Sequence, residues 1–121
     1  MRLLTMNTLR CNRKDVDEGR LKLEATKVEV RETEFDRTFV EHLLPSLEWA
    51  TLRDAAISTG LTALPLELDD TLRGDGDFLR ALHHVLFDVH VLEGRLVCAE
   101  TGHVFPIEQG RPNMTLPEEL V

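Results

Sequence analysis

The sequence predicts an α+β fold in which a small zinc-ribbon-like β domain is built from both termini and a three-helix lobe is inserted between its halves. Apolar and polar residues alternate near both ends of the chain, whereas apolar residues recur at helical spacing in the middle. Cys11 lies near the start and Cys98 near the end. Structural zinc usually takes two close pairs of ligands, and each end offers half a pair. We therefore place the β domain at residues 1–32 plus 87–121 and the helical insert at residues 33–86.

Strands are expected on both sides of the insert. Residues 3–9 are predicted to form a first strand, and residues 21–30 alternate apolar and polar side chains as a half-buried strand does. The alternation slips at Thr26 and Lys27, which indicates a β-bulge. After the insert, a further strand is expected from Phe87. Turns containing glycine are expected to divide the rest of the chain at residues 93–94, 100–102 and 109–110.

The insert predicts three helices. Asp36 precedes apolar residues at helical spacing and is expected to cap the first helix, which Pro45 ends. The second helix is expected over residues 48–59, with Gly60 as its C-terminal stop. Asp77 is expected to cap the third helix.

Composition limits the function. With 121 residues and 42% hydrophobic content, the chain can bury one ordinary core without needing a metal or a disulfide. The 22 acidic and 14 basic side chains give a net charge of -8, which disfavours direct binding to phosphate backbones, so any association with RNA is expected to be indirect. No apolar run approaches the ~20 residues that span a bilayer. Without a recognisable secretory leader, we expect a soluble protein of the cytoplasm and nucleus, with reduced thiols.

Four segments, taken in order, carry a resemblance to a known family. Residues 1–9, 78–84, 93–98 and 110–114 resemble the tRNA methyltransferase 112 subunit family, the small activator subunits of eukaryotic and archaeal methyltransferases. The resemblance covers nearly the whole chain and includes the helical insert. It implies a non-catalytic subunit that forms heterodimers with S-adenosylmethionine-dependent methyltransferases acting on tRNA, rRNA and a translation termination factor. It also implies that S-adenosylmethionine binds to the partner and that this chain holds no cofactor.

A methyltransferase with an exposed strand edge can be covered by a strand from such a partner. We expect the N-terminal strand and the C-terminal hairpin to dock the catalytic subunit. The expected partner-binding residues are Thr5, Asn7, Leu9, Phe105, Ile107, Arg111, Pro112, Asn113 and Met114. The same pattern is compatible with Phe105 and Ile107 as core residues and with Asn113 as a turn cap.

Zinc-bearing relatives carry four cysteines, and the matching second positions here are approximately Val16 and Thr101, neither of which binds zinc. We therefore expect no metal, with two small buried thiols packed in its place. A replacement site, whose spacing matches no usual ligand pair, would combine Cys11, Cys98 and His103 with Asp15 or Asp17.

A second hypothesis is a stand-alone metal-dependent hydrolase that uses His83, His84, Asp88 and His90. A change from helix to strand after Leu86 would splay these side chains apart, which favours a solvated or interface face instead. No phosphate-binding loop, serine elbow or recognisable cysteine nucleophile motif accompanies them.

Overall fold

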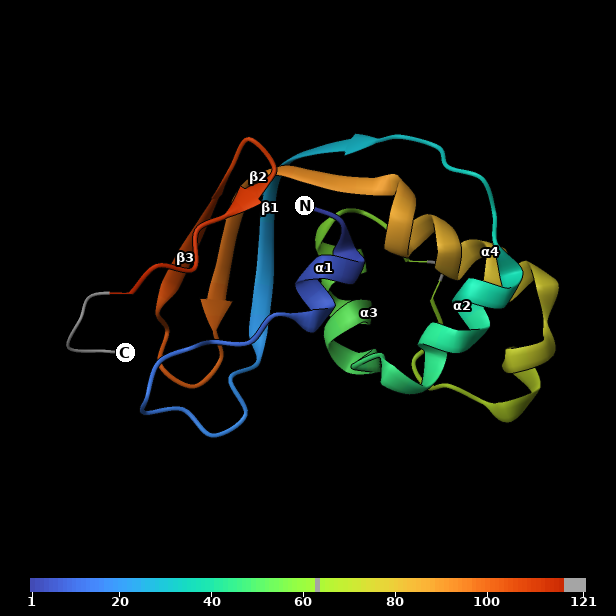
Figure 1. Cartoon of the computed structure of the whole chain (residues 1–121), viewed down its shortest axis with the longest axis horizontal. Coiled ribbons are helices and arrows are strands. Elements are labelled where there is room, and N and C mark those ends of the chain that lie inside the picture. Colours follow the sequence, from blue (N-terminus) through green and yellow to red (C-terminus); the bar gives the residue numbers. More distant parts are fainter. Residues whose placement is uncertain (63, 117–121) are drawn as a thin grey trace.

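The computed structural model describes residues 1–62 and 64–116 and shows an antiparallel sheet beside a group of helices (Figure 1). The helices and strands are α1 Leu3–Thr8, β1 Leu21–Val30, α2 Arg37–Leu43, α3 Trp49–Ser58, α4 Gly76–His83, β2 Val89–Cys98, β3 Val104–Glu108 and β4 Arg111–Pro112. Short 3₁₀ turns cover Leu44–Ser46 and Asp70–Gly74, and a π-helical turn covers His84–Asp88. This mixed architecture, with its helices apart from a four-stranded antiparallel sheet, confirms the α+β class.

The sheet has the order β1-β2-β3-β4, and its two long strands, β1 and β2, pair from Leu21 with Cys98 to Val30 with Val89. The register shifts on either side of Lys27, which confirms the predicted bulge. The predicted turn at residues 93–94 is wrong, because β2 continues through it. Gly94 has a φ of 155°, and a Cβ there would collide with the carbonyl oxygen of Glu24. Because glycine has no Cβ, β2 can pass close to β1 at the bulge without a break in the strand.

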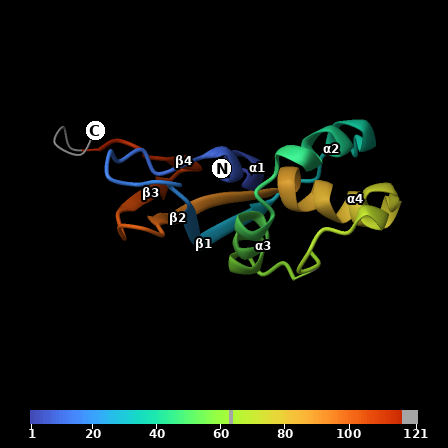
Figure 2. The ribbon, with the colours of Figure 1, turned by 90° about the horizontal axis from the view of Figure 1, so that it is seen from below.

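Residues 3–8 form the helix α1, so the predicted first strand is wrong. Leu3, Met6 and Asn7 are buried, and their spacing of three and four residues places them on one helical face. The helix lies beside α3 and the sheet (Figures 1 and 2). A helix of six residues is marginal alone, so its packing must stabilise it.

The helical insert contains the three predicted helices. Asp36 caps α2 by accepting the amide hydrogen of Phe39 at 3.0 Å, as expected. The predicted cap of α4 is wrong by two residues: Asp75, not Asp77, accepts the amides of Asp77 and Phe78, at 3.0 and 3.3 Å. The helical backbone then continues through the π-helical turn to Asp88, so β2 begins at Val89 rather than at Phe87.

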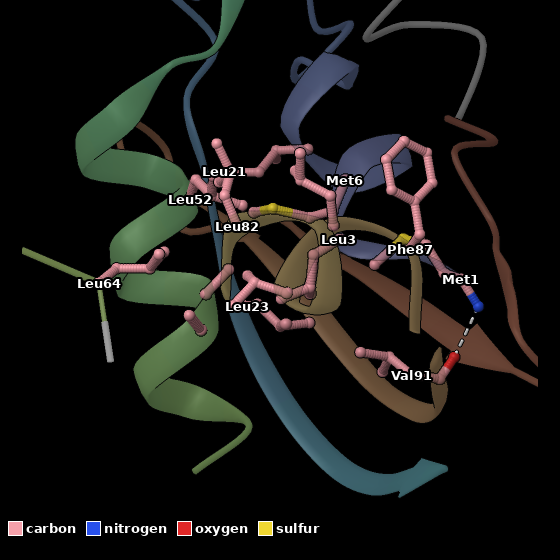
Figure 3. Close-up of a cluster of buried hydrophobic side chains, with 14 of the residues drawn as sticks. Met1, Leu3, Met6, Leu21, Leu23, Leu52, Leu64, Leu82, Phe87 and Val91 are labelled. Carbon is pink, nitrogen blue, oxygen red and sulfur yellow. Dashed lines mark hydrogen bonds between the residues drawn. The ribbon is translucent and has the colours of Figure 1, made fainter. Parts of the chain in front are cut away.

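One apolar core joins the sheet, α1 and the helices of the insert (Figure 3). Leu3, Leu23, Leu52 and Leu82 meet in its centre. At its edge, Met1 pairs with Val91: the terminal amino group donates to the Val91 carbonyl at 2.8 Å, and the Val91 amide donates back at 2.7 Å. Among the described residues, no helix has the length and apolarity needed to cross a membrane. The division into a β domain and an insert stays a prediction.

Candidate partner-docking surface

The N-terminal segment and the C-terminal hairpin lie side by side. The side chain of Asn12 donates to the carbonyl oxygen of Met114 at 3.0 Å. A Cβ at Gly110 would lie 3.3 Å from the Met1 nitrogen, so this turn contacts the start of the chain. Figure 2 shows β4 close to α1. Two segments separated by almost the whole sequence therefore form one continuous surface.

Six of the nine expected partner-binding residues lie on this surface with exposed or half-buried side chains, and we call them the docking surface: Thr5, Leu9, Arg111, Pro112, Asn113 and Met114. Thr5 and Leu9 reach it from α1 and the residue that follows α1, and the others come from β4 and the residues after it. Whether this surface binds a partner stays a prediction.

The other three expected residues are buried, so their side chains are not available at the surface. Asn7 is 3% exposed, and its side chain donates to the Glu48 carbonyl at 2.9 Å and accepts the Glu48 amide at 3.0 Å. It holds the start of α3. Phe105 and Ile107 are 0% and 2% exposed, because this face of β3 turns toward the core.

The opposite face of β3 belongs to the hairpin that we expect to dock, but its residues are not among the nine expected partner-binding residues. Val104, which is 41% exposed, and Pro106 alternate with the buried positions. Pro106 lines a groove of about 730 Å³ across the open face of the sheet, together with Arg95 and Glu24, whose side chains form an ion pair at 2.9 Å. The two-residue period of a strand identifies this face once Phe105 is known to point inward.

The hairpin of β3 and β4 presents a strand edge beside the docking surface. Gln109 and Gly110 form its turn with φ values of 52° and 75°, which suits a two-residue hairpin connection. Over residues 1–62 and 64–116, no further strand pairs with β4. Asn113 donates its amide to the Pro106 carbonyl at 2.8 Å and accepts the Thr115 amide at 3.0 Å, so its side chain also caps a turn.

A family model described as Trm112p-like protein matches residues 2–110. The chain belongs to the Trm112p-like family. It is 44% identical to multifunctional methyltransferase subunit TRM112 homolog A of Arabidopsis thaliana, and the match covers 100% of both chains. It is 43% identical to the corresponding TRM112-like protein of Mus musculus, covering 98% of this chain and 97% of that one. Its fold is similar to that of a chain in the solved E. cuniculi Mtq2–Trm112 complex, with a TM-score of 0.65, 20% identity and 95% coverage of both chains.

The two cysteines of this Trm112p-like chain come together. Cys11 and Cys98 are 5% and 1% exposed, they belong to the same buried cluster, and each thiol affects the pKa of the other. Burial raises the pKa of the Cys11 thiol. Burial acts in the same direction on Cys98, but the hydroxyl and amide of Thr101 and the amide of Glu100 outweigh it and lower the pKa of that thiol.

These donors do not fit a zinc site. Thr101, expected near a former ligand position, binds the Cys98 sulfur instead, and the ring of His103 packs on Phe105 at 4.7 Å between centroids. Within the part of the chain that the structure describes, no group of three or more His, Cys, Asp or Glu side chains could hold a metal. Two thiols alone leave a tetrahedral zinc ion short of half its usual ligands.

The histidine cluster forms only in part. The predicted splaying is wrong for His84 and Asp88, because the π-helical turn brings His84 Nδ1 to 2.8 Å from Asp88 Oδ2. Asp88 Oδ1 accepts the amide and hydroxyl of Thr33 at 3.0 and 2.6 Å. His83 Nε2 lies 2.9 Å from the same hydroxyl, whereas His90 lies on β2 opposite Arg2.

Thr33 follows β1 and Asp88 precedes β2, so this network joins the two points where the chain passes between the sheet and the helical insert. Burial raises the pKa of Asp88, but the hydrogen bonds from Thr33 and His84 outweigh it and hold the pKa below the ordinary value. The arrangement is that of a structural tie, and no observation supports the hydrolase hypothesis.

Proposed function

We propose that this chain is a small non-catalytic subunit that binds, stabilises and activates S-adenosylmethionine-dependent methyltransferases as a heterodimer. Its membership of the Trm112p-like family supports this proposal, together with its relatives in Arabidopsis thaliana and Mus musculus, which are named multifunctional methyltransferase subunits. The substrates of these complexes are tRNA, rRNA and a translation termination factor. The solved Mtq2–Trm112 complex is responsible for methylation of the eRF1 termination factor.

The observation that carries the proposal is the meeting of both ends of the chain around the edge of β4. A catalytic subunit with a doubly wound sheet can pair one of its own strands with such an edge, so that backbone hydrogen bonds provide affinity. The exposed side chains of Thr5, Arg111 and Asn113 would then select the partner. A hollow of about 450 Å³ beside Arg111 and Asn113 gives room for a partner side chain.

We further propose that the chain works without zinc or another cofactor, and that S-adenosylmethionine is bound by the partner. The β domain keeps a zinc-ribbon-like arrangement in which the two thiols pack at the former metal position. The helical insert, residues 33–86, carries ten acidic and four basic side chains, which supports only indirect association with RNA. The substrates place the heterodimers in the cytoplasm and nucleus.

Co-expression with an eRF1-modifying methyltransferase of the same organism tests the docking surface. Thr5→Arg with Arg111→Glu changes two exposed side chains, so the isolated subunit should keep its melting temperature. We expect at least a ~10-fold loss of co-purified, active methyltransferase, because bulk and reversed charge block docking. The matched control Thr38→Arg with Arg73→Glu changes exposed residues of the helical insert and should keep full yield. Undiminished yield and activity with the first pair would reject the docking surface.

The proposal that the chain is not catalytic and holds no cofactor needs a separate test. The isolated subunit should neither bind S-adenosylmethionine in calorimetry nor transfer a methyl group alone. Elemental analysis of protein purified without chelator should give well under one zinc per chain. Stoichiometric zinc would contradict the cofactor proposal and leave the docking proposal untouched.

A further inference from the structure

Cys11 lies in the loop between α1 and β1, which packs against the turn between β2 and β3, and Cys98 is the last residue of β2, directly before that turn. The Cys11 amide donates to the Gly19 carbonyl at 2.7 Å, which closes the loop on itself. Gly19 has a φ of 67°, and a Cβ there would lie 2.9 Å from the Cys11 carbonyl oxygen, so only glycine fits. The Ala99 amide donates to the Arg20 carbonyl at 2.9 Å, which fixes the loop to the turn.

A carboxylate adds a second connection between these segments. Glu100 accepts the amides of Asp17 and Glu18, both at 3.0 Å. These hydrogen bonds therefore hold the loop against the end of β2, and Cys11 and Cys98 are both buried in the same cluster there. No further cysteine exists in the sequence, and the described residues gather no third metal ligand around the pair.

Two buried thiols on neighbouring segments, with no metal ligand set around them, can be oxidised to a disulfide. We propose that Cys11 and Cys98 form a reversible intramolecular disulfide when the chain meets a two-electron oxidant such as hydrogen peroxide. The cross-link would join the loop to the last residue of β2. This inference rests on the thiol geometry and holds whether or not the chain activates methyltransferases.

The surroundings assign the order of the two steps. Cys98 reacts first as the thiolate, because the effect of burial on its pKa is outweighed by hydrogen bonding from Thr101 and Glu100 and its pKa is lowered, whereas burial raises the pKa of the Cys11 thiol. Its sulfur attacks one peroxide oxygen, the O–O bond breaks, and the departing oxygen leaves as water after taking a proton, which yields a sulfenic acid. The sulfur of Cys11 then attacks the Cys98 sulfur. The S–O bond breaks, the S–S bond forms, and the proton of Cys11 leaves with the second water. Two thiols and one peroxide thus give one disulfide and two waters.

The cross-link would also act on the neighbouring surface. Asn12, next to Cys11, donates to the Met114 carbonyl, so the loop that carries one cysteine contacts the docking surface directly. Fixing this loop covalently should raise the melting temperature by on the order of 5–10 °C, because the bond closes a long stretch of chain in the unfolded state.

The experiment treats the full folded chain with hydrogen peroxide and quenches it by alkylation. The expected product has lost the mass of two hydrogen atoms, contains a Cys11–Cys98 peptide pair in non-reducing digests, and melts at the higher temperature until dithiothreitol reverses both changes. Disulfide-linked dimers, sulfinic acid at either cysteine, or two thiols that stay alkylatable in oxidant would each overturn the proposal.

Two variants test the order of the steps. In Cys11→Ser, the Cys98 sulfenic acid has no resolving thiol and should be trapped by dimedone. In Cys98→Ser, Cys11 should react much more slowly, since burial keeps it protonated. Faster dimedone labelling of Cys11 than of Cys98 would overturn the assigned order. If either variant fails to fold, non-reducing digests of the peroxide-treated chain without substitutions still test whether the disulfide forms.

Discussion

The two ends of β2 are each tied to a distant segment by a carboxylate, but in opposite surroundings. Asp88, just before β2, accepts the amide and hydroxyl of Thr33. Glu100, just after β2, accepts the amides of Asp17 and Glu18. Asp88 is 5% exposed and also contacts His84, whereas Glu100 is exposed. The number of hydrogen bonds is similar, and the access of water differs.

The difference in burial between Asp88 and Glu100 predicts how strongly the stability of the chain depends on each carboxylate. Water can replace an exposed carboxylate as the acceptor for a freed amide, so losing Glu100 should cost little. The Asp88 carboxylate is itself buried and its hydrogen bonds to Thr33 are partly buried, so water should replace it less readily than it replaces Glu100. The tie between the sheet and the helical insert should therefore be much stronger than the tie beside the thiols.

The largest expected effect is that of Asp88→Ala. It should lower the free energy of unfolding by about 3 kcal/mol, because a buried carboxylate that accepts from both the amide and the hydroxyl of Thr33 is lost. Urea denaturation followed by circular dichroism measures the change. Asp88→Asn is the control, since its side-chain oxygen can still accept from Thr33, and it should lose only about half as much. A loss below about 1 kcal/mol in Asp88→Ala would break the comparison.

Low pH should remove the contribution of the Asp88 carboxylate to the stability of the fold. Its pKa lies below the ordinary value of 3.8, so the charged form stabilises the fold above that pH, and the contribution disappears as pH falls through the lowered pKa. The stability gap between the natural chain and Asp88→Asn, about 1–2 kcal/mol near neutral pH, should therefore shrink at pH values below 3.8. Urea denaturation across this range measures it. A gap that widens in acid would contradict the assigned sign.

Glu100→Gln should have a smaller effect, about 1 kcal/mol or less, because its partners are solvated. Hydrogen exchange gives a sharper measurement, since the amides of Asp17 and Glu18 should exchange faster while the Thr33 amide keeps its protection. If Glu100→Gln destabilised the chain more than Asp88→Ala, burial would not be what separates the two ties.

The smallest effect is expected for His84→Ala. The side chain of His84 is 40% exposed, so its contact with Asp88 should contribute only about 0.5 kcal/mol. His42→Ala, on the exposed face of α2, is the matched control and should be neutral. Thermal unfolding distinguishes the two variants. If His84→Ala lost as much stability as Asp88→Ala, the His84 imidazole rather than the Asp88 carboxylate would be the main contributor to the tie.

Local signals predicted several elements correctly. β1 with its bulge, α2 with its Asp36 cap, and α3 all follow from patterns within a few residues. The errors lie where long-range packing decides. Residues 3–8 become helical because one face can pack against α3, and the π-helical turn of residues 84–88 carries Asp88 to Thr33. Neither partner is visible in the local sequence.

The docking surface shows the same division. The sequence suggested that its N-terminal and C-terminal segments are neighbours, whereas the hydrogen bond from Asn12 to Met114 is seen only in the structure. The period of β3 also fixed that Phe105 and Ile107 share one face. It could not say whether that face points to the core or to solvent, because the answer depends on which side of the sheet the helices cover.

The charge balance, the class of fold, the Asp36 helix cap and the family resemblance all follow from the sequence, because each depends on residue types or on patterns over short spacings. The roles of Asn7, which anchors α3, and of Asp88, which joins the sheet to the insert, become visible only in the folded chain. These contacts join residues 41 and 55 positions apart, so no local sequence pattern marks them, and the fold alone sets which backbone segments become neighbours.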